Sequence, residues 1–283
     1  MTPDWLGAAR RAAEAIGAML AEHPTIAERV VETGGRGEGG DRTLEIDAAA
    51  ERAVFGELER LHDEGARFTV VSEERGVVDY GGRAGDGVIV VVDPIDGSMN
   101  AKRGMPHHAL SIAVADGPTM ADVVFGYVRD LGPAEEWVAW RGRGAELNGE
   151  RLDPRLGERR ARDGKLELVG IESADPRWVR DSIEALVSTS HRLRAIGTIA
   201  STLCQVAAAR LDGMTTLRDC RSVDAAAGQL IVREAGGHVA FTSFEDPLGA
   251  PLDLEPRSPV VAARTRAGLR ELAVVAGPAT MEG

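Results

Sequence analysis

Two aspartates three residues apart follow directly on an apolar run. Residues 88–100 read VIVVVDPIDGSMN, and Asp93 and Asp96 come after five β-branched residues. Such a run predicts a buried strand, and α/β folds place ligands just past the carboxyl ends of their strands. Pro94 and Gly97 predict a sharp turn, because proline cannot donate to a strand ladder and glycine permits a left-handed backbone. The stretch therefore predicts a strand that delivers two carboxylates to a ligand; the alternative is an acidic turn in which Asp96 caps a helix.

The residues after this turn have the chemistry of a phosphate contact. Gly97 and Ser98 are predicted to begin a helix, and the first N–H groups of a helix have no partner within it. Such N–H groups bind anions well, and the hydroxyl of Ser98 adds a further donor.

Two further carboxylates stand in comparable places. Glu73 follows the apolar run FTVV, and Asp224 opens VDAAAGQLIVREAGG at the predicted start of a helix, where a simple capping role is the alternative. Brought together, these groups and the aspartate pair would repel one another. Mg2+ would relieve that repulsion, because it prefers hard oxygen ligands and keeps waters and phosphate in its shell.

Three segments carry a resemblance to a known family. SEE, DPIDGSMN and VDAAAGQLIVREAGG resemble, in order and spacing, the signatures of the inositol monophosphatase family of magnesium-dependent, lithium-sensitive phosphatases. The likeness covers nearly the whole chain, and residues 124–152 and 194–218 are similar to the archaeal-type enzymes that act on inositol monophosphate and fructose 1,6-bisphosphate. It implies an α/β fold, the layered αβαβα sandwich, and a Mg2+-dependent phosphomonoesterase that hydrolyses a small sugar or cyclitol phosphate.

The resemblance also implies roles for individual residues. Two or three Mg2+ ions are expected in each site. Glu73, Asp93 and the carbonyl of Ile95 would bind one ion, and Asp93, Asp96 and Asp224 would bind a second. Activated water would attack the phosphorus in line with the leaving oxygen. The catalytic residues implied are Asp47, Glu73 and Ser98.

Substrate contacts are expected along two further segments. A glutamate contacts inositol in animal-type enzymes seven residues before the distal metal aspartate; Leu217 stands there, followed by Arg218. An arginine suits a second phosphate better than a neutral hydroxyl, so bisphosphorylated or otherwise anionic sugars are predicted to be better substrates than inositol 1-phosphate. A structural ion pair, for example with Asp219, is the alternative for Arg218. The substrate-binding residues predicted are Asp96, Gly97, Ser98, Arg194, Gly197, Thr198 and Arg218.

Composition limits the partners. The 283 residues contain 45 acidic and 33 basic side chains, a net charge of −12, which argues against duplex nucleic acid. The two cysteines form no CxxC pair, the N-terminus has no signal-peptide pattern, and no apolar run reaches the length of a membrane span. We expect a cytoplasmic protein without membrane contact, and the family resemblance implies a homodimer.

The chain is predicted to form one compact unit of two halves. Residues 1–155 would carry most metal ligands and residues 156–283 would complete the site, joined by the polar stretch 151–164. The glycine-rich segment 33–40 is predicted to be a mobile loop, and Asn148-Gly149 a hairpin turn. Predicted helices open at Thr2-Pro3 and near Asp47 and cover 176–189, 199–211, 224–235 and a segment from 265; predicted strands are 67–72, 87–92, 109–115, 122–129, 135–140, 166–171, 192–196, 214–217 and 259–263.

Other functions stay open. A nucleotide 3′-phosphatase, or a dedicated sugar- or nucleoside-phosphate phosphatase of a biosynthetic pathway, is the alternative within the enzyme class. A non-catalytic regulator that binds protein or RNA is the alternative of another class. A P-loop is excluded, since GxxxxGK[ST] does not occur, and His107-His108 lacks a second cluster of zinc ligands.

Overall fold

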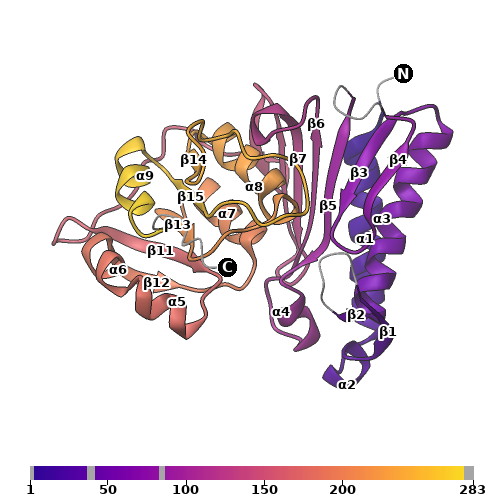
Figure 1. Ribbon diagram of the computed structural model, residues 1–283, viewed down its shortest axis with the longest axis horizontal. Coiled ribbons are helices and arrows are strands. Elements are labelled where there is room, and N and C mark those ends of the chain that lie inside the picture. The colour runs from indigo at the N-terminus through magenta and orange to yellow at the C-terminus, as the bar shows by residue number, and fades with distance from the viewer. Residues whose placement is uncertain (1–2, 37–41, 83–86, 277–283) are drawn as a thin grey trace.

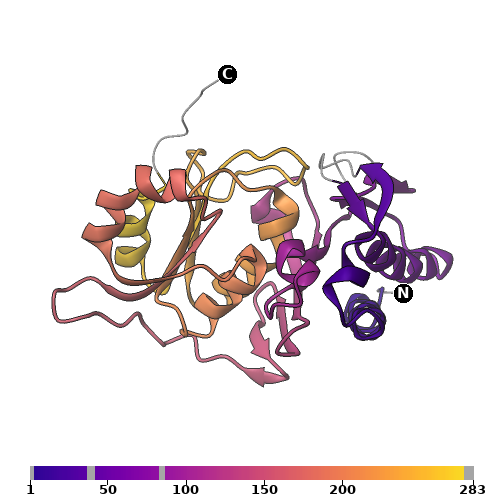
Figure 2. The same cartoon turned by 90° about the horizontal axis from the view of Figure 1, so that it is seen from below.

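The computed structural model describes residues 3–36, 42–82 and 87–276. For residues 32–36 and 42–44 it describes the backbone alone. Two large β-sheets and three groups of helices alternate along the long axis of the molecule (Figures 1 and 2), and a separate two-stranded sheet lies outside these layers. The described residues therefore form the α/β sandwich of five layers, αβαβα, that the sequence predicted.

The larger sheet has eight strands and forms the second layer. Their spatial order is β10-β9-β8-β7-β6-β5-β3-β4, and only β3 and β5 run parallel to each other. The strands are β3 (Phe68–Ser72), β4 (Gly76–Tyr80), β5 (Ile89–Asp96), β6 (Ala109–Ala115), β7 (Val123–Asp130), β8 (Glu135–Trp140), β9 (Gly144–Leu147) and β10 (Glu150–Arg151).

The smaller sheet has five strands and forms the fourth layer. Its order is β12-β11-β13-β15-β14, with β11 parallel to both of its neighbours. The strands are β11 (Leu166–Glu172), β12 (Ser190–Arg194), β13 (Gly213–Thr216), β14 (His238–Phe241) and β15 (Val260–Ala263).

Three apolar cores hold the layers together. The first joins α1 (Trp5–Glu22) and α3 (Glu45–Asp63) to the outer face of the large sheet. The central core packs α7 (Ile199–Ala207) and α8 (Ser222–Glu234) between the two sheets (Figure 1). The third core covers the far face of the small sheet with α5 (Pro176–Asp181), α6 (Ile183–Thr189) and α9 (Arg266–Ala273). Shorter elements are α2 (Ile26–Arg29), β1 (Glu32–Arg36), β2 (Arg42–Leu44), α4 (Ser98–Lys102) and η1 (Met120–Asp122).

Most predicted elements are present, and the differences have local causes. The first helix is capped by Asp4 rather than by Thr2, and the predicted helix 176–189 breaks into two at Ser182. Strands β4 and β14 were not predicted, because each is only four or five residues long and partly exposed. Of the predicted glycine loop 33–40, residues 33–36 instead belong to strand β1, and 37–40 lie outside the described residues.

Candidate active site

A bulge in β5 brings the paired aspartates to one face of the sheet. Asp93 pairs with Ser111 and Asp96 pairs with Ala109, so three residues of β5 span two residues of β6. In a regular strand, residues three apart point to opposite faces, whereas the extra residue of a bulge restores the same face. The predicted strand end at residue 92 was wrong: β5 continues through the DPID segment.

Three carboxylates converge beside this bulge. Side-chain oxygens of Glu73, Asp93 and Asp224 all lie within 4.8 Å of one another. Glu73 follows β3, whose last residue pairs in parallel with Val92, so it leaves the sheet beside Asp93. Asp224 comes from the first turn of α8, which packs against the inner face of this sheet. Three segments far apart in the sequence thus bring together three of the four carboxylates that the sequence predicted to converge.

The helix-cap alternative for Asp224 is compatible with membership of the cluster. Asp224 Oδ2 accepts a hydrogen bond from the backbone N–H of Arg221 at 3.1 Å, a capping contact that fixes the side chain. The same residue contributes a ligand atom to the cluster. Capping therefore orients this carboxylate.

Burial makes the negative charges of the cluster costly. Asp93 is 2% exposed, and its pKa is raised well above the ordinary value by burial and then by repulsion from Glu73, Asp96 and Asp224. Burial raises the pKa of Glu73 to about 7, while Arg221 acts in the opposite direction. Burial also raises the pKa of Asp224. Buried carboxylates of this kind are ionised at neutral pH when a cation neutralises them.

The turn that carries Glu73 is anchored by a residue that the sequence interpretation missed. Glu51 of α3 is 6% exposed and accepts hydrogen bonds from the Ser72 hydroxyl at 2.7 Å and from the Arg75 backbone N–H at 3.0 Å. Glu51 lies one helical turn after Asp47, so the same face of α3 supports two parts of the site.

Asp96 lies outside the three-carboxylate cluster and faces the start of α7. Its Oδ2 accepts hydrogen bonds from the Thr198 hydroxyl at 2.5 Å and from the Ala200 backbone N–H at 2.6 Å. Burial and repulsion from Asp224 raise the pKa of Asp96 well above its usual range, and these two donors oppose the shift. Its role as a ligand of a second ion remains a prediction.

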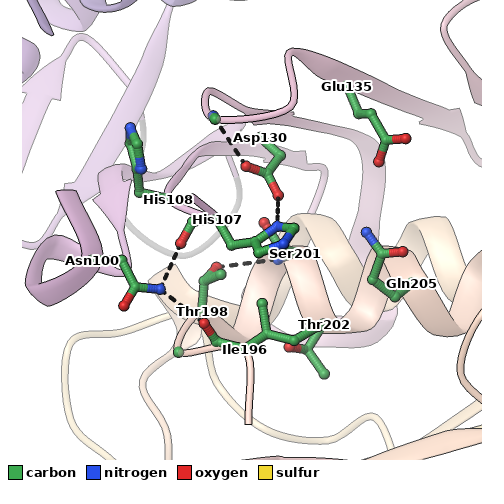
Figure 3. Close-up of polar contacts among 12 residues, drawn as sticks. Asn100, His107, His108, Asp130, Glu135, Ile196, Thr198, Ser201, Thr202 and Gln205 are labelled. Atoms are coloured by element: carbon green, nitrogen blue, oxygen red, sulfur yellow. Dashed lines mark hydrogen bonds and ion pairs between the residues drawn. The ribbon is translucent and has the colours of Figure 1, made fainter. Parts of the chain in front are cut away.

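A hydrogen-bonded junction joins the DPIDG turn to residues 196–198. The amide nitrogen of Asn100 donates to the carbonyls of His107 at 2.9 Å and Ile196 at 2.8 Å (Figure 3). Gly97 has φ +85°, and a Cβ atom there would lie 2.9 Å from the carbonyl oxygen of Gly197. Only glycine fits such an approach, so the predicted substrate residues Gly97, Gly197 and Thr198 do lie together.

Glu172 of β11 stabilises this junction by hydrogen bonds to residues 196 and 197. Its carboxylate accepts hydrogen bonds from the N–H groups of Ile196 and Gly197, each at 3.0 Å, and from the Thr202 hydroxyl at 2.6 Å. Burial raises its pKa to about 7. No local pattern marks Glu172, because its partners come from later segments.

The remaining predicted catalytic residues line a small cavity beside the cluster. Asp47 and Ser98 border it together with Glu73, Asp93 and Ile95, and its volume is about 30 Å³. Lys102, one turn after Ser98 on α4, also borders this cavity, with its Nζ 4.0 Å from Asp47 Oδ2. Lys102 was not predicted, although its spacing from Ser98 was a usable signal.

The two arginines predicted to bind substrate lie at the surface. Arg194 is exposed at the end of β12 and donates to the carbonyl of Leu193 at 2.8 Å. Arg218 is exposed, and its guanidinium lies 4.9 Å from the ring centre of Trp178. Leu217, in place of the family's glutamate, is buried.

Other candidate sites lack this chemistry. His107 Nδ1 lies 2.8 Å from the buried carboxylate of Asp130, and no zinc-type cluster forms around it among the described residues (Figure 3).

A cavity of about 490 Å³ lies between α1 and strands β7 and β8, where Arg10 pairs with Glu136. It is larger than the carboxylate cavity but holds no convergent acidic cluster of described residues. Within the described ranges, no helix has the length and apolar character to span a bilayer.

Comparisons with known proteins identify the family of the chain. A fructose-1,6-bisphosphatase/inositol-1-monophosphatase from Thermococcus kodakarensis is 39% identical over 201 residues, 71% of this chain and 70% of that protein. A Nus factor SuhB from Escherichia coli is 34% identical over 239 residues, 83% of this chain and 84% of that protein. A crystal structure of an inositol monophosphatase-fructose 1,6-bisphosphatase has a TM-score of 0.76 over 96% of this chain and 99% of its own, at 23% identity, which shows the fold. The family model of the inositol monophosphatases matches residues 3–276. The chain therefore belongs to the inositol monophosphatase family, a family of phosphatases.

Proposed function

We propose that this chain is a Mg2+-dependent phosphomonoesterase that hydrolyses a small sugar or cyclitol phosphate. The observation that carries the proposal is the convergence of Glu73, Asp93 and Asp224 within 4.8 Å. This donor set fits a hard divalent cation, because it offers carboxylate oxygens and a buried excess of negative charge. The cavity beside it is bordered by the Ser98 hydroxyl and by Asp47, the partners expected for a phosphate and an attacking water.

Bound Mg2+ would supply an activated water nucleophile and neutralise charge on the leaving oxygen. Glu73, Asp93 and the carbonyl of Ile95 are proposed to hold one ion, and Asp93, Asp96 and Asp224 a second. Asp93 would thus serve both ions. Asp47 and Ser98 would orient the water by accepting and donating hydrogen bonds. Lys102 would supply positive charge beside Asp47.

The substrate proposed is an anionic sugar of the fructose 1,6-bisphosphate type. The names of two similar proteins, from Thermococcus kodakarensis and Methanothermobacter thermautotrophicus, include fructose-1,6-bisphosphatase as well as inositol-1-monophosphatase. Leu217 offers no hydrogen bond to a sugar hydroxyl, whereas Arg218 offers a cation within one residue of it. These features support a substrate with a second anionic group over inositol 1-phosphate.

A second candidate is a regulator that acts by binding. Its support is the likeness to proteins named Nus factor SuhB, at 34% identity to the one from Escherichia coli. The chain has every carboxylate expected for the metal site, and this favours an enzyme over a regulator that acts only by binding.

We further propose a cytoplasmic homodimer. The apolar residues of 109–140 do not provide its surface, because they are mostly buried in the chain's own core. Among the described residues, Met99 and Met105 are large apolar side chains exposed near the site, at 65% and 50%. Light scattering at micromolar concentration would show a monomer if the dimer proposal is wrong.

Phosphate release from a panel of substrates tests the function. Fructose 1,6-bisphosphate, inositol 1-phosphate, a nucleoside 3′-phosphate and a simple sugar monophosphate would be compared with Mg2+ and with EDTA. We expect Mg2+-dependent release, fastest from the bisphosphate. Absence of release from every substrate, by folded protein that binds Mg2+, would favour the regulator.

A further inference from the structure

One cation of the chain itself lies against the carboxylate cluster. The guanidinium of Arg221 contacts Glu73, with Nη2 to Oε1 at 2.6 Å, and its Nε lies 4.0 Å from Asp224 Oδ2. The arginine side chain is 22% exposed, and its two partners are 19% and 13% exposed. This ion pair is partly buried and joins residues 148 positions apart.

The backbone of Arg221 is fixed in place, whereas its guanidinium group can move. Its N–H group caps α8 through Asp224, so the main chain cannot shift without breaking that cap. The side chain reaches the cluster from the loop before α8 and retains contact with solvent. A guanidinium on such a stem can leave Glu73 by rotation of its side-chain torsions alone.

A guanidinium and a divalent cation compete in this place. Both are attracted by the same carboxylates, because Arg221 lies against Glu73 and Asp224, two of the three members of the cluster. They also repel each other, because two cations a few ångströms apart in a partly buried site interact strongly. An arginine that pairs with a metal ligand therefore lowers the affinity of the site for metal.

We propose that Arg221 is a built-in competitor of the divalent cation, which must displace its guanidinium from Glu73 to bind. Arg221 neutralises the cluster when metal is scarce and raises the metal concentration at which the site fills. This inference rests on the metal site of the proposed function and adds a residue that sets its affinity.

Two other roles for Arg221 predict different effects of removing its side chain on metal affinity. If Arg221 only held Glu73 in a geometry that metal requires, its removal would weaken metal binding. If it served only the cap of α8, which involves its backbone, its side chain would not affect metal affinity. Competition alone predicts that removal of the charge tightens binding.

Calorimetric titration with Mg2+ at pH 8 tests the proposal. Arg221→Met keeps the length of the side chain and removes the charge, and we expect it to bind Mg2+ about tenfold more tightly than the wild type. Arg221→Lys keeps the charge and should bind with nearly wild-type affinity. Thermal unfolding in EDTA gives an independent readout: Arg221→Met should melt at a lower temperature than the wild type and gain more from added Mg2+.

Arg180→Met is the matched control. Arg180 pairs with Asp181 at 2.8 Å on α5, which covers the far face of the small sheet, so this variant removes the same net charge and should not change Mg2+ affinity. Unchanged or weaker Mg2+ binding by folded Arg221→Met overturns the competition. Absence of Mg2+ binding by the wild type and by Arg221→Met alike overturns the proposed metal site itself.

Discussion

The two sides of the site differ in how they satisfy their polar groups. On one side, Glu73, Asp93 and Asp224 converge at the end of the large sheet and repel one another. On the other side, Asn100 and Glu172 bind the backbone of residues 196–197 through complementary donors and acceptors. The first side is electrostatically unfavourable as it stands, and the second is satisfied within the chain.

The difference shows what each side is for. The carboxylates of the cluster stay together because the strands and α8 hold them there and because Arg221 offsets part of their charge, and the apolar cores supply the stability that the remaining repulsion costs. A hydrogen-bonded junction needs no external partner and serves to align Gly97, Gly197 and Thr198. Substitutions should therefore have opposite effects on stability on the two sides.

The largest effect is expected at Asp93. Asp93→Asn should lower turnover by about a thousandfold, equivalent to ~4 kcal/mol, because one carboxylate is proposed to serve both ions. The same change should raise the melting temperature in EDTA at pH 8, since it removes a charge from a repulsive group. Initial rates and calorimetry would be compared with wild type; near-normal turnover would contradict the bridging role.

On the junction side, the expected effect on stability is the reverse. Asn100→Ala removes both amide hydrogen bonds from two partly buried carbonyls, so we expect a loss of about 1–3 kcal/mol in the free energy of unfolding. Asn100→Asp, which keeps the size but removes the donors, should lose at least as much. Denaturant unfolding in EDTA measures both, and wild-type stability of Asn100→Ala would show that the junction forms without these bonds.

Arg218 is predicted to affect substrate binding rather than the stability of either side of the site. Arg218→Ala should raise the KM for fructose 1,6-bisphosphate by about fivefold, ~1 kcal/mol, because an exposed charged hydrogen bond is lost. Its effect on a sugar monophosphate should be smaller. An equal loss for both substrates would assign Arg218 to the packing against Trp178 instead.

The smallest expected effect is on the pH dependence of stability. The pKa of Glu172 is raised to about 7, so the folded protein holds a proton that the unfolded chain releases near pH 4.5. Its contribution to stability is therefore fully present below about pH 4.5 and is lost as the pH rises through 7. Glu172→Gln should flatten this decline, whereas Glu184→Gln, at an exposed position, should not; parallel curves for Glu172→Gln and wild type would contradict the assignment.

The sequence predicted the cluster better than its surroundings. Glu73, Asp93 and Asp224 were expected to lie together because each was predicted to follow a strand or to open a helix within a recognisable segment, and the fold class followed from the same resemblance. The bulge at Pro94 was not predicted, although a proline inside a strand is a signal for one. Glu51, Glu172 and Arg221 were not given a role at the site because their partners lie 21, 24 and 148 residues away, distances at which no periodic pattern operates.

The most direct test of the metal site is a Mg2+ titration of wild type and Asp93→Asn near pH 7 in two buffers with different heats of ionisation. The wild type is predicted to bind Mg2+ and to release protons, because cation binding would ionise Glu73, whose pKa is raised to about 7, and its neighbour Asp93, whose pKa is also raised by burial. Asp93→Asn is predicted to bind weakly or not at all. Equal Mg2+ binding by the two proteins, or none by the wild type, would contradict a metal centre at Glu73, Asp93 and Asp224.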